Sequence, residues 1–491
     1  MDLSKKNEIN YDDISKSDLK TRLARLTRIC ENLEIPVLVM VDGFESSGKG
    51  YVINELTEEL NPKYFDVEVF EKDEENDKKF PFSKRFFDSI PKKGHIKIFD
   101  RSFYYKLFDN TDISNEELKN QIQSLEKIEK MLYDDETIII KFFLNVSEDE
   151  QKERIKELKD SKQKSFYLTK ADIEQNKNYK KYQKHFENIL EMTNFDFSPW
   201  TVVDSDDLKK ASKATLYQML EMLTIGIERV SNQRLDNKNT ERSYKKQSSI
   251  IENLDLNKSI SKDDYKKKKD KLQKEVKDTI FELYEAGIST VLVFEGVDAA
   301  GKDGAIERLI KKVDPRLYTV HAISAPSKEE IDHHYLWRFY NRLPEDGYLG
   351  IFSRSWYGRV MVERVEGLAS TRAWSRSYDE IREFEKEISD HGSLIMKFFV
   401  VIDKDEQYQR FMDRVNNPDK NYKITDEDWR NRNKWENYIE AMDEMLYRTN
   451  FDFAPWVIVE GNDKPYARIK VMEEFLSQAK DLLKNKARDD K

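Results

Sequence analysis

Residues 291–304 read VLVFEGVDAAGKDG, an apolar run followed by a loop with the spacing G-x-x-x-x-G-K. The apolar run predicts a buried strand, and the polar residues after the loop predict a helix. The N–H groups of such a loop, with a helix N-terminus behind them, form a concavity of positive partial charge that suits phosphate. We therefore expect a phosphate-binding loop formed by Gly296, Ala299, Ala300, Gly301, Lys302, Asp303 and Gly304.

Two side chains of this loop are candidates for chemistry. Lys302 adds a full positive charge that can follow a moving phosphoryl group, so we predict a catalytic role for it. The next residue is Asp303, where a Ser or Thr usually contacts magnesium, so a metal ligand must come from elsewhere. Asp298 lies inside the loop and offers hard oxygen atoms. We predict that Asp298 is catalytic as the ligand of a Mg²⁺ cofactor.

The chain carries this arrangement twice. Residues 37–50, VLVMVDGFESSGKG, match residues 291–304, and Lys49 and Lys302 are 253 positions apart (302 − 49). Trp200 and Trp456, in a later matching stretch, are 256 positions apart (456 − 200). The polar stretch 232–250 between the copies reads as a linker, with a boundary near residue 240. We predict two tandem domains, residues 1–235 and 236–491.

Apolar runs alternate with long charged stretches in both copies. Runs that are nearly continuous in hydrophobic residues suit a parallel sheet covered on both faces by helices. This pattern predicts an α/β fold, present twice, with strands in eight runs: 36–43, 95–100, 137–146, 199–203, 289–296, 348–353, 393–402 and 455–461.

Composition and the distribution of apolar residues indicate where the protein is located and which partners it does not bind. The sequence has no apolar run of about 18 residues that could span a bilayer, and its first residues lack the apolar core of a signal peptide. We therefore expect a soluble cytoplasmic protein that does not bind membranes. The single cysteine, Cys30, falls at an apolar position and reads as a small core residue. The chain has a net charge of −10 and lacks a known nucleic-acid-binding motif, so we do not expect the protein to bind nucleic acid.

Three stretches of the second copy resemble the polyphosphate kinase 2 family: residues 296–304, 331–367 and 424–456. The doubled layout is similar to the tandem branch of that family, the polyphosphate:AMP phosphotransferases. The resemblance implies a P-loop, thymidylate-kinase-like core in three layers with a helical lid. It also implies Mg²⁺-dependent transfer of the terminal phosphoryl group of inorganic polyphosphate to a nucleoside monophosphate, most plainly AMP to ADP.

Basic residues of the second copy supply further candidates. The resemblance implies that Arg354 faces the phosphate chain, and we predict a catalytic role for it. Arg359 follows it in the same basic stretch and is a candidate for substrate binding, because a guanidinium binds phosphate oxygens in pairs. Arg308 and Arg316, after the loop, are candidates for lining a polyphosphate groove, and Lys423 for a lid contact. A solvated surface is the alternative for these side chains.

Ser353 bears on which of the two copies is catalytic. It lies where the first copy has Asp100 and where related enzymes hold a magnesium-binding acid. The first copy replaces the loop acid by Glu45 and lacks a counterpart of Arg359, so we predict that the second copy is catalytic and the first is structural or regulatory. Ser353 itself is either a tolerated replacement or a lesion.

Two other functions stay open at this stage. One is an ATP-dependent nucleotide kinase, because the fold does not fix the donor. The other is an inactive polyphosphate-binding protein, which Ser353 would favour. A homodimer of tandem chains is possible.

Overall fold

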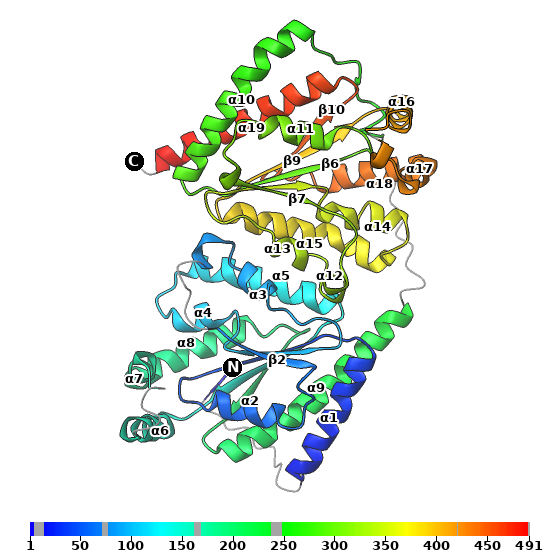
Figure 1. Cartoon of the computed structure of the whole chain (residues 1–491). Helices are drawn as coiled ribbons and strands as arrows, with labels where there is room; N and C mark the ends of the chain where they lie inside the picture. Colours follow the sequence, from blue (N-terminus) through cyan, green and yellow to red (C-terminus); the bar gives the residue numbers. More distant parts are fainter. Residues whose placement is uncertain (4–13, 71–76, 162–167, 237–247, 420, 490–491) are drawn as a thin grey trace. The chain divides into compact units, whose positions relative to one another are not determined.

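The computed structural model describes residues 1–3, 14–70, 77–161, 168–236, 248–419 and 421–489 (Figure 1). The chain divides into two compact units. Unit 1 comprises Met1–Asp73, Arg85–Asp236 and Lys328–His334, and unit 2 comprises Glu74–Lys84, Asn237–Ser327 and Tyr335–Lys491. Each unit contains one five-stranded sheet in which every pair of neighbouring strands is parallel.

The sheet of unit 1 has the strand order β2-β3-β1-β4-β5. Its central strand, β1, is buried over its apolar residues and pairs with strands on both sides. The strands are β1 Val37–Gly43, β2 Phe65–Val69, β3 Ile96–Asp100, β4 Ile138–Asn145 and β5 Trp200–Asp204.

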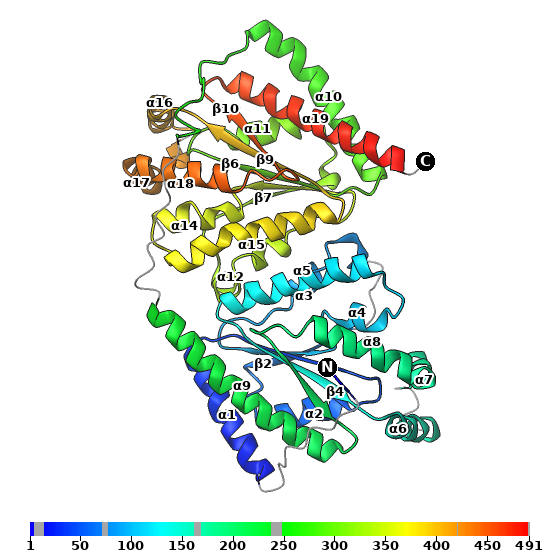
Figure 2. The same ribbon diagram turned by 180° about the vertical axis from the view of Figure 1, so that it is seen from behind.

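Helices cover both faces of this sheet (Figures 1 and 2). One face carries α1 Lys16–Asn32, α2 Lys49–Thr57 and α9 Leu208–Asp236. The other carries α3 Lys84–Phe87, α4 Tyr105–Asp109, α5 Asn115–Asp134 and α8 Tyr179–Met192. The remaining helices of unit 1 are α6 Glu148–Asp160, α7 Lys170–Lys177 and α12 Lys328–Asp332.

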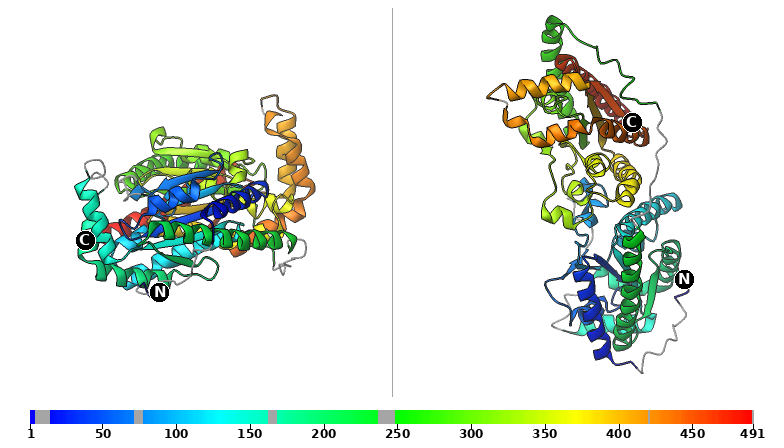
Figure 3. Two further views of the ribbon diagram at one scale, coloured as in Figure 1. Left: turned by 90° about the horizontal axis from the view of Figure 1, so that it is seen from below. Right: turned by 90° about the vertical axis from the view of Figure 1, so that its right-hand side faces the viewer.

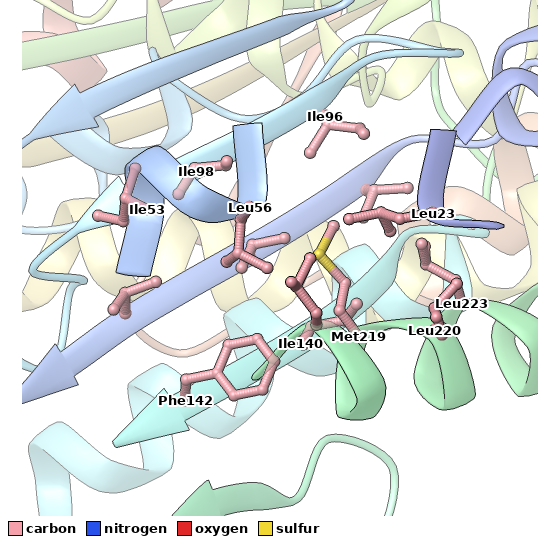
Figure 4. Packing of buried hydrophobic residues seen from close by; sticks show 14 of the residues in the cluster. Leu23, Ile53, Leu56, Ile96, Ile98, Ile140, Phe142, Met219, Leu220 and Leu223 are labelled. Atoms are coloured by element: carbon pink, nitrogen blue, oxygen red, sulfur yellow. The ribbon is translucent and has the colours of Figure 1, made fainter. Parts of the chain in front are cut away.

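The core between the sheet and the first of these helical layers is apolar (Figure 4). Side chains from α1, α2 and α9 meet side chains from β3 and β4 there. Full burial of one such side chain contributes about 1.5–3 kcal/mol, so the layer is held mainly by the hydrophobic effect. The labelled members are Leu23, Ile53, Leu56, Ile96, Ile98, Ile140, Phe142, Met219, Leu220 and Leu223.

Unit 2 repeats the topology of unit 1. Its sheet order is β10-β9-β6-β8-β7, which reads in reverse as the same arrangement of strands. The strands are β6 Thr290–Gly296, β7 Tyr318–Ala322, β8 Leu349–Ser353, β9 Leu394–Val401 and β10 Trp456–Glu460. Phe294 pairs with Ser353 in this sheet as Val41 pairs with Asp100 in unit 1, so the two copies also share their register.

Helices again form a layer on each face of the sheet of unit 2. One layer holds α10 Lys262–Glu285, α11 Lys302–Leu309 and α19 Lys464–Asp489, and the other holds α13 Trp337–Tyr340, α14 Val362–Val365, α15 Thr371–Asp390 and α18 Trp435–Arg448. Short 3₁₀ helices are η1 Asp77–Lys79, η3 Pro315–Leu317, η4 Trp356–Arg359 and η5 Asn421–Lys423. Two helices, α16 Lys404–Val415 and α17 Asp426–Asn433, extend from the layered body of unit 2 as the helical lid (Figure 3, orange).

The α/β prediction with parallel sheets is confirmed, and all eight predicted runs contain strands. β2 and β7 were not predicted from the sequence, because these edge strands consist of exposed and half-buried residues instead of apolar runs. The linker prediction was partly wrong, since α9 continues to Asp236. Arg234 stabilises this last turn by donating to the Leu33 carbonyl and the Glu136 carboxylate. Residues 237–247 of the predicted linker lie outside the described residues.

Ser15 caps α1 and Ser261 caps α10, and α10 is longer than α1 by seven residues (24 against 17). Cys30 is buried, which agrees with the prediction of a small core residue. Within the described part of the chain, no helix is long and apolar enough to cross a membrane. The domain boundary near residue 240 stays a prediction.

Candidate active site

The loop between β6 and α11 has positive backbone φ angles at three positions. Gly296 ends β6 with φ +134°, and a Cβ atom there would lie 2.0 Å from the carbonyl oxygen of Val400 on the neighbouring strand. Gly301 caps α11 with φ +105°, and Ala299 between them has φ +62°. Since only glycine fits at Gly296 without a backbone clash, the strand and the loop are joined in one fixed way.

Lys302 is the first residue of α11 and turns back over the loop. Its Nζ donates hydrogen bonds to the carbonyl oxygens of Gly296 (2.8 Å) and Val297 (3.2 Å). Burial lowers the pKa of this ammonium group, and the negative charge of Asp298 opposes that shift. The loop therefore holds a cation whose present partners are neutral carbonyl groups.

Asp298 lies at the centre of the side-chain contacts of the loop. Its Oδ1 is 3.4 Å from the Arg354 guanidinium, and its Oδ2 accepts a hydrogen bond from Asn431 Nδ2 at 3.0 Å. Gln407 of α16 donates to the Asp298 main-chain carbonyl at 3.2 Å. The lid helices α16 and α17 thus contact the loop acid directly through amide side chains.

Arg354 and Ser353 come from the end of β8, next to β6. Arg354 has φ +64°, and its N–H donates to the Phe294 carbonyl, which fixes the turn after the strand. Ser353 Oγ donates to Asp303 Oδ1 at 2.9 Å. The structure therefore brings the loop, Lys302, Asp298 and Arg354 together at the carboxyl edge of the sheet.

A buried ion pair supports the segment that carries Arg354. Lys397 of β9 contacts Glu385 of α15 at 2.7 Å, and both side chains have no exposed surface. Trp356 and Tyr357 donate to the same Glu385 carboxylate at 3.0 and 2.7 Å. These two aromatic side chains are part of the core, as is usual after a strand, and they do not form a wall of an open site.

Two further polar side chains, those of Arg410 and Ser355, stabilise the loop and the end of β6. Arg410 of α16, 4% exposed, donates to the carbonyl oxygens of Ala299 and Ala300 and to those of Gly461 and Asn462, so it ties the loop to the end of β10. Ser355 Oγ donates to the buried carboxyl of Glu295 at 2.7 Å, and burial raises the pKa of that carboxyl.

A pocket opens beside Asp298 and Arg354. Its polar lining comes from the loop, Arg354 and the lid helices, and apolar side chains of the η4–α14 segment and of α18 line it as well. A site that combines polar groups with an apolar lining suits a ligand that has a charged end and an aromatic end. The apolar lining residues are Met361, Val362, Trp435, Ile439 and Met442.

Some predicted substrate residues have other partners. Arg359 pairs with Glu363 and stacks over Tyr335, and Arg316 pairs with Asp314 on the exposed η3 turn.

Arg308 pairs with its neighbour Glu307 on α11. Lys423 ends η5, and its side chain lies outside the described residues. Among the described side chains, Arg308, Arg316 and Arg359 form no hydrogen bond or ion pair with the loop, and the role of all four basic residues in substrate binding stays a prediction.

The matching loop of unit 1 has the same backbone shape, with positive φ at Gly43, Ser46 and Gly48. Its charges are arranged differently. The longer side chain of Glu45 reaches both Lys49 (3.7 Å) and Arg101 (3.5 Å). Lys49 Nζ also donates to the Phe44 carbonyl at 3.1 Å, as Lys302 donates to loop carbonyl groups. The units differ in that Glu45 forms ion pairs with both cations, whereas Asp298 forms an ion pair with Arg354 and, within the described part of the chain, none with Lys302.

Sequence reasoning missed Asn431, Gln407 and Arg410. The repeat contained a signal for two of them, because Gln151 and Arg154 occupy the positions of Gln407 and Arg410 at the 256-residue spacing and make the same contacts to the loop of unit 1. Asn431 also has a counterpart at this spacing, Gln175 (431 − 175 = 256), whose Oε1 accepts a hydrogen bond from the Glu45 N–H, although the residue type differs.

The site offers few metal ligands. Among the described residues, no group of three or more His, Cys, Asp or Glu side chains is arranged to hold a metal ion. Asp298 presents a carboxylate with 19% exposed surface at the loop, and Asp303 lies in the first turn of α11. One or two carboxylates fit Mg²⁺ when phosphate oxygens complete its coordination, so the residues present suit this ion.

The comparisons with known proteins agree with this geometry. The sequence matches the model of the polyphosphate kinase 2 (PPK2) family over residues 6–231 and 259–487. It is 35% identical to a polyphosphate:AMP phosphotransferase of Pseudomonas aeruginosa over 95% of each chain, and 31% identical to one of Acinetobacter johnsonii over 96% of this chain and 97% of that protein. The crystal structure of a putative polyphosphate kinase 2 from P. aeruginosa superimposes with a TM-score of 0.83 at 32% identity over 96% of each chain.

Proposed function

The chain belongs to the polyphosphate kinase 2 family, and from this we propose that unit 2 transfers the terminal phosphoryl group of inorganic polyphosphate to AMP, forming ADP. Relatives that match nearly the whole chain carry the name polyphosphate:AMP phosphotransferase. The observation that carries the proposal is the loop of unit 2, in which Lys302 Nζ donates to two main-chain carbonyl groups next to a pocket lined by Asp298, Arg354 and several apolar side chains.

The reaction requires positioning and charge stabilisation more than bond-making groups from the protein. An oxygen of the AMP phosphate attacks the terminal phosphorus of polyphosphate, and the bridging P–O bond breaks to leave a chain shorter by one phosphate. The loop N–H groups and Lys302 stabilise the negative charge that spreads over the transferred group. Arg354, whose guanidinium lies beside the loop acid and lines the pocket, binds oxygens of the phosphate chain.

We propose Mg²⁺ as the cofactor, held by Asp298. When bound, the ion neutralises part of the charge of the phosphates. Arg354 and Asn431 hold the two oxygens of the Asp298 carboxylate in place from different elements. The side chain is therefore oriented before the ion arrives, which reduces the free-energy cost of assembling the site.

We propose that the acceptor nucleotide occupies the pocket beside Asp298. Its apolar lining, which includes Trp435 of α18, suits the flat face of a nucleobase, and its polar lining includes Arg354. Because Asn431 of α17 also lines this pocket, the lid and the loop enclose the acceptor together. Exclusion of water by such a lid favours transfer to AMP over hydrolysis.

We propose that unit 1 does not catalyse the reaction. Its Glu45 carboxylate pairs with Lys49 and Arg101, the two cations that a phosphate would need. A phosphate there would have to displace a protein carboxylate from both cations, whereas among the described residues of unit 2 Asp298 pairs with Arg354 and leaves Lys302 without an ion pair. AMP and polyphosphate are intracellular substrates, so we expect the protein to act in the cytoplasm. The homodimer stays a prediction.

The experiment incubates the pure protein with AMP, MgCl₂ and polyphosphate of defined chain length, and separates the nucleotides by ion-exchange chromatography. We expect ADP to appear in proportion to enzyme and polyphosphate. A protein that forms ADP only when ATP replaces polyphosphate would be a conventional nucleotide kinase. A protein that forms no ADP from polyphosphate at any chain length would refute the proposal.

A further inference from the structure

Two positions in each copy of the repeat carry one carboxylate between them. The first is the residue after the loop lysine, and the second is the last residue of the neighbouring strand. Unit 1 has Gly50 and Asp100 at these positions, and unit 2 has Asp303 and Ser353. Each copy therefore has one carboxylate in the pair, on the strand in unit 1 and on the helix in unit 2.

The structure shows that the two positions of unit 2 meet. Ser353 Oγ donates a 2.9 Å hydrogen bond to Asp303 Oδ1, so the carboxylate from α11 reaches the end of β8. The hydroxyl group holds one carboxylate oxygen and leaves the other open. Asp303 is exposed, and no Lys or Arg of the described residues forms an ion pair with it.

An exposed carboxylate in this place is unfavourable for the proposed function unless a cation lies beside it. Asp303 begins the helix that closes the phosphate-binding loop, and a phosphate chain bound there would repel it. A divalent cation between the two removes the repulsion, because Mg²⁺ binds carboxylate and phosphate oxygens together. Asp298 lies 3.4 Å from the Arg354 guanidinium, whereas Asp303 forms a hydrogen bond with the Ser353 hydroxyl and, among the described residues, no ion pair, although the Lys302 ammonium group attracts its charge at longer range.

We propose that Asp303 is a second carboxylate ligand of the Mg²⁺ site and that Ser353 is its positioning residue. Compared with unit 1, unit 2 has the carboxylate on α11 instead of on the strand, and a hydroxyl group occupies the strand position. Ser353 is thus a compensated replacement and not a lesion. This inference rests on the proposed function, since it assigns ligands within the same site.

The test measures metal binding directly, with Mn²⁺ as a spectroscopic substitute for Mg²⁺ followed by electron paramagnetic resonance on the full-length protein. Asp303→Asn should weaken Mn²⁺ binding by about tenfold or more, since a ligand is lost, and should raise the Mg²⁺ concentration that gives half-maximal rate. Ser353→Ala should weaken binding less, because only the orientation of the ligand changes. Glu307→Gln, which removes an exposed acid from the same helix, is the control and should leave binding unchanged.

The exchange variant gives the sharper result. Asp303→Ser combined with Ser353→Asp returns the carboxylate to the strand and should restore Mn²⁺ binding that Asp303→Ser alone has lost. Circular dichroism verifies that each variant is folded. If Asp303→Asn binds Mn²⁺ like the unmodified protein, or if the exchange variant binds no better than Asp303→Ser, the assignment is wrong. ADP formation by the unmodified protein is measured separately, so failure of the proposed function is distinguishable from failure of this inference.

Discussion

Replacing Glu385 by Gln removes the charge that Lys397 faces in the core of unit 2. The two side chains are 2.7 Å apart and fully buried, and the ammonium group also donates to Tyr357 and to the Thr449 carbonyl. Glutamine has almost the same shape, so no cavity forms. The change leaves an uncompensated charge in a place that water does not reach.

The size of the effect follows from that burial. Removing one partner of a buried ion pair typically costs about 3–5 kcal/mol, because the remaining charge is desolvated without compensation. Lys397 keeps hydrogen bonds to neutral oxygens, so we expect the lower part of this range. Glu385 also accepts hydrogen bonds from Trp356 and Tyr357, and a shift of the segment that carries Arg354 should reduce kcat/KM by about tenfold to hundredfold.

The pH dependence of this variant has a definite sign. Burial lowers the pKa of Lys397, and the Glu385 carboxylate opposes that shift, so Glu385→Gln lowers the pKa further. In the unfolded chain a lysine titrates near 10.4. At pH values between the pKa of Lys397 in the folded variant and the pKa of lysine in the unfolded chain, the unfolded state binds more protons than the folded state. The free energy of unfolding therefore rises with pH over this range. The loss of stability should therefore be largest near neutral pH and should shrink as the pH rises.

Hydrogen exchange measured by mass spectrometry resolves the two units separately. Glu385→Gln should reduce protection of β9, and the matched variant Glu129→Gln should reduce protection of β4, because Lys141 and Glu129 form the same buried pair in unit 1. Of the two, Glu385→Gln should affect ADP formation directly. Unchanged protection of β9, or a loss of stability that does not depend on pH, would refute this account of the pair.

Two further predictions concern the loop and the lid. Gly296→Ala should destabilise unit 2 and abolish ADP formation, since its Cβ would lie 2.0 Å from the Val400 carbonyl, whereas Gly50→Ala has open space and should behave like the unmodified protein in thermal unfolding and activity. Asn431→Ala should raise the Mg²⁺ concentration needed for half-maximal rate, because it frees one oxygen of the loop acid, and Gln175→Ala at the matching lid position of unit 1 should not change that concentration.

Much of the fold could be predicted from the sequence because its signals are local. A buried parallel strand is a continuous apolar run, so β1, β4, β6 and β9 could be predicted from the sequence. The internal repeat supports these predictions, because β1 matches β6 and β4 matches β9. Edge strands such as β7 lack that run, since only part of their surface is buried.

The site was predictable only in part. The loop and its charged residues form a contiguous motif, so Asp298 and Lys302 were identified at once. Asn431 reaches Asp298 from 133 residues away, and such a contact depends on how α17 packs against the loop. The role of Ser353 stayed open between a tolerated replacement and a lesion, because its partner, Asp303, is 50 residues distant and the hydrogen bond between them is visible only in three dimensions.

The central claim is that unit 2 carries the phosphoryl transfer and unit 1 does not. The most direct measurement compares ADP formation from AMP and polyphosphate by the unmodified protein, Lys302→Ala and Lys49→Ala under the same conditions. Lys302→Ala should lose activity by about a hundredfold or more, because the charge that stabilises the transferred group is removed. Lys49→Ala should remain close to the unmodified protein. Full activity in Lys302→Ala, or a large loss in Lys49→Ala, would contradict the assignment of the working unit.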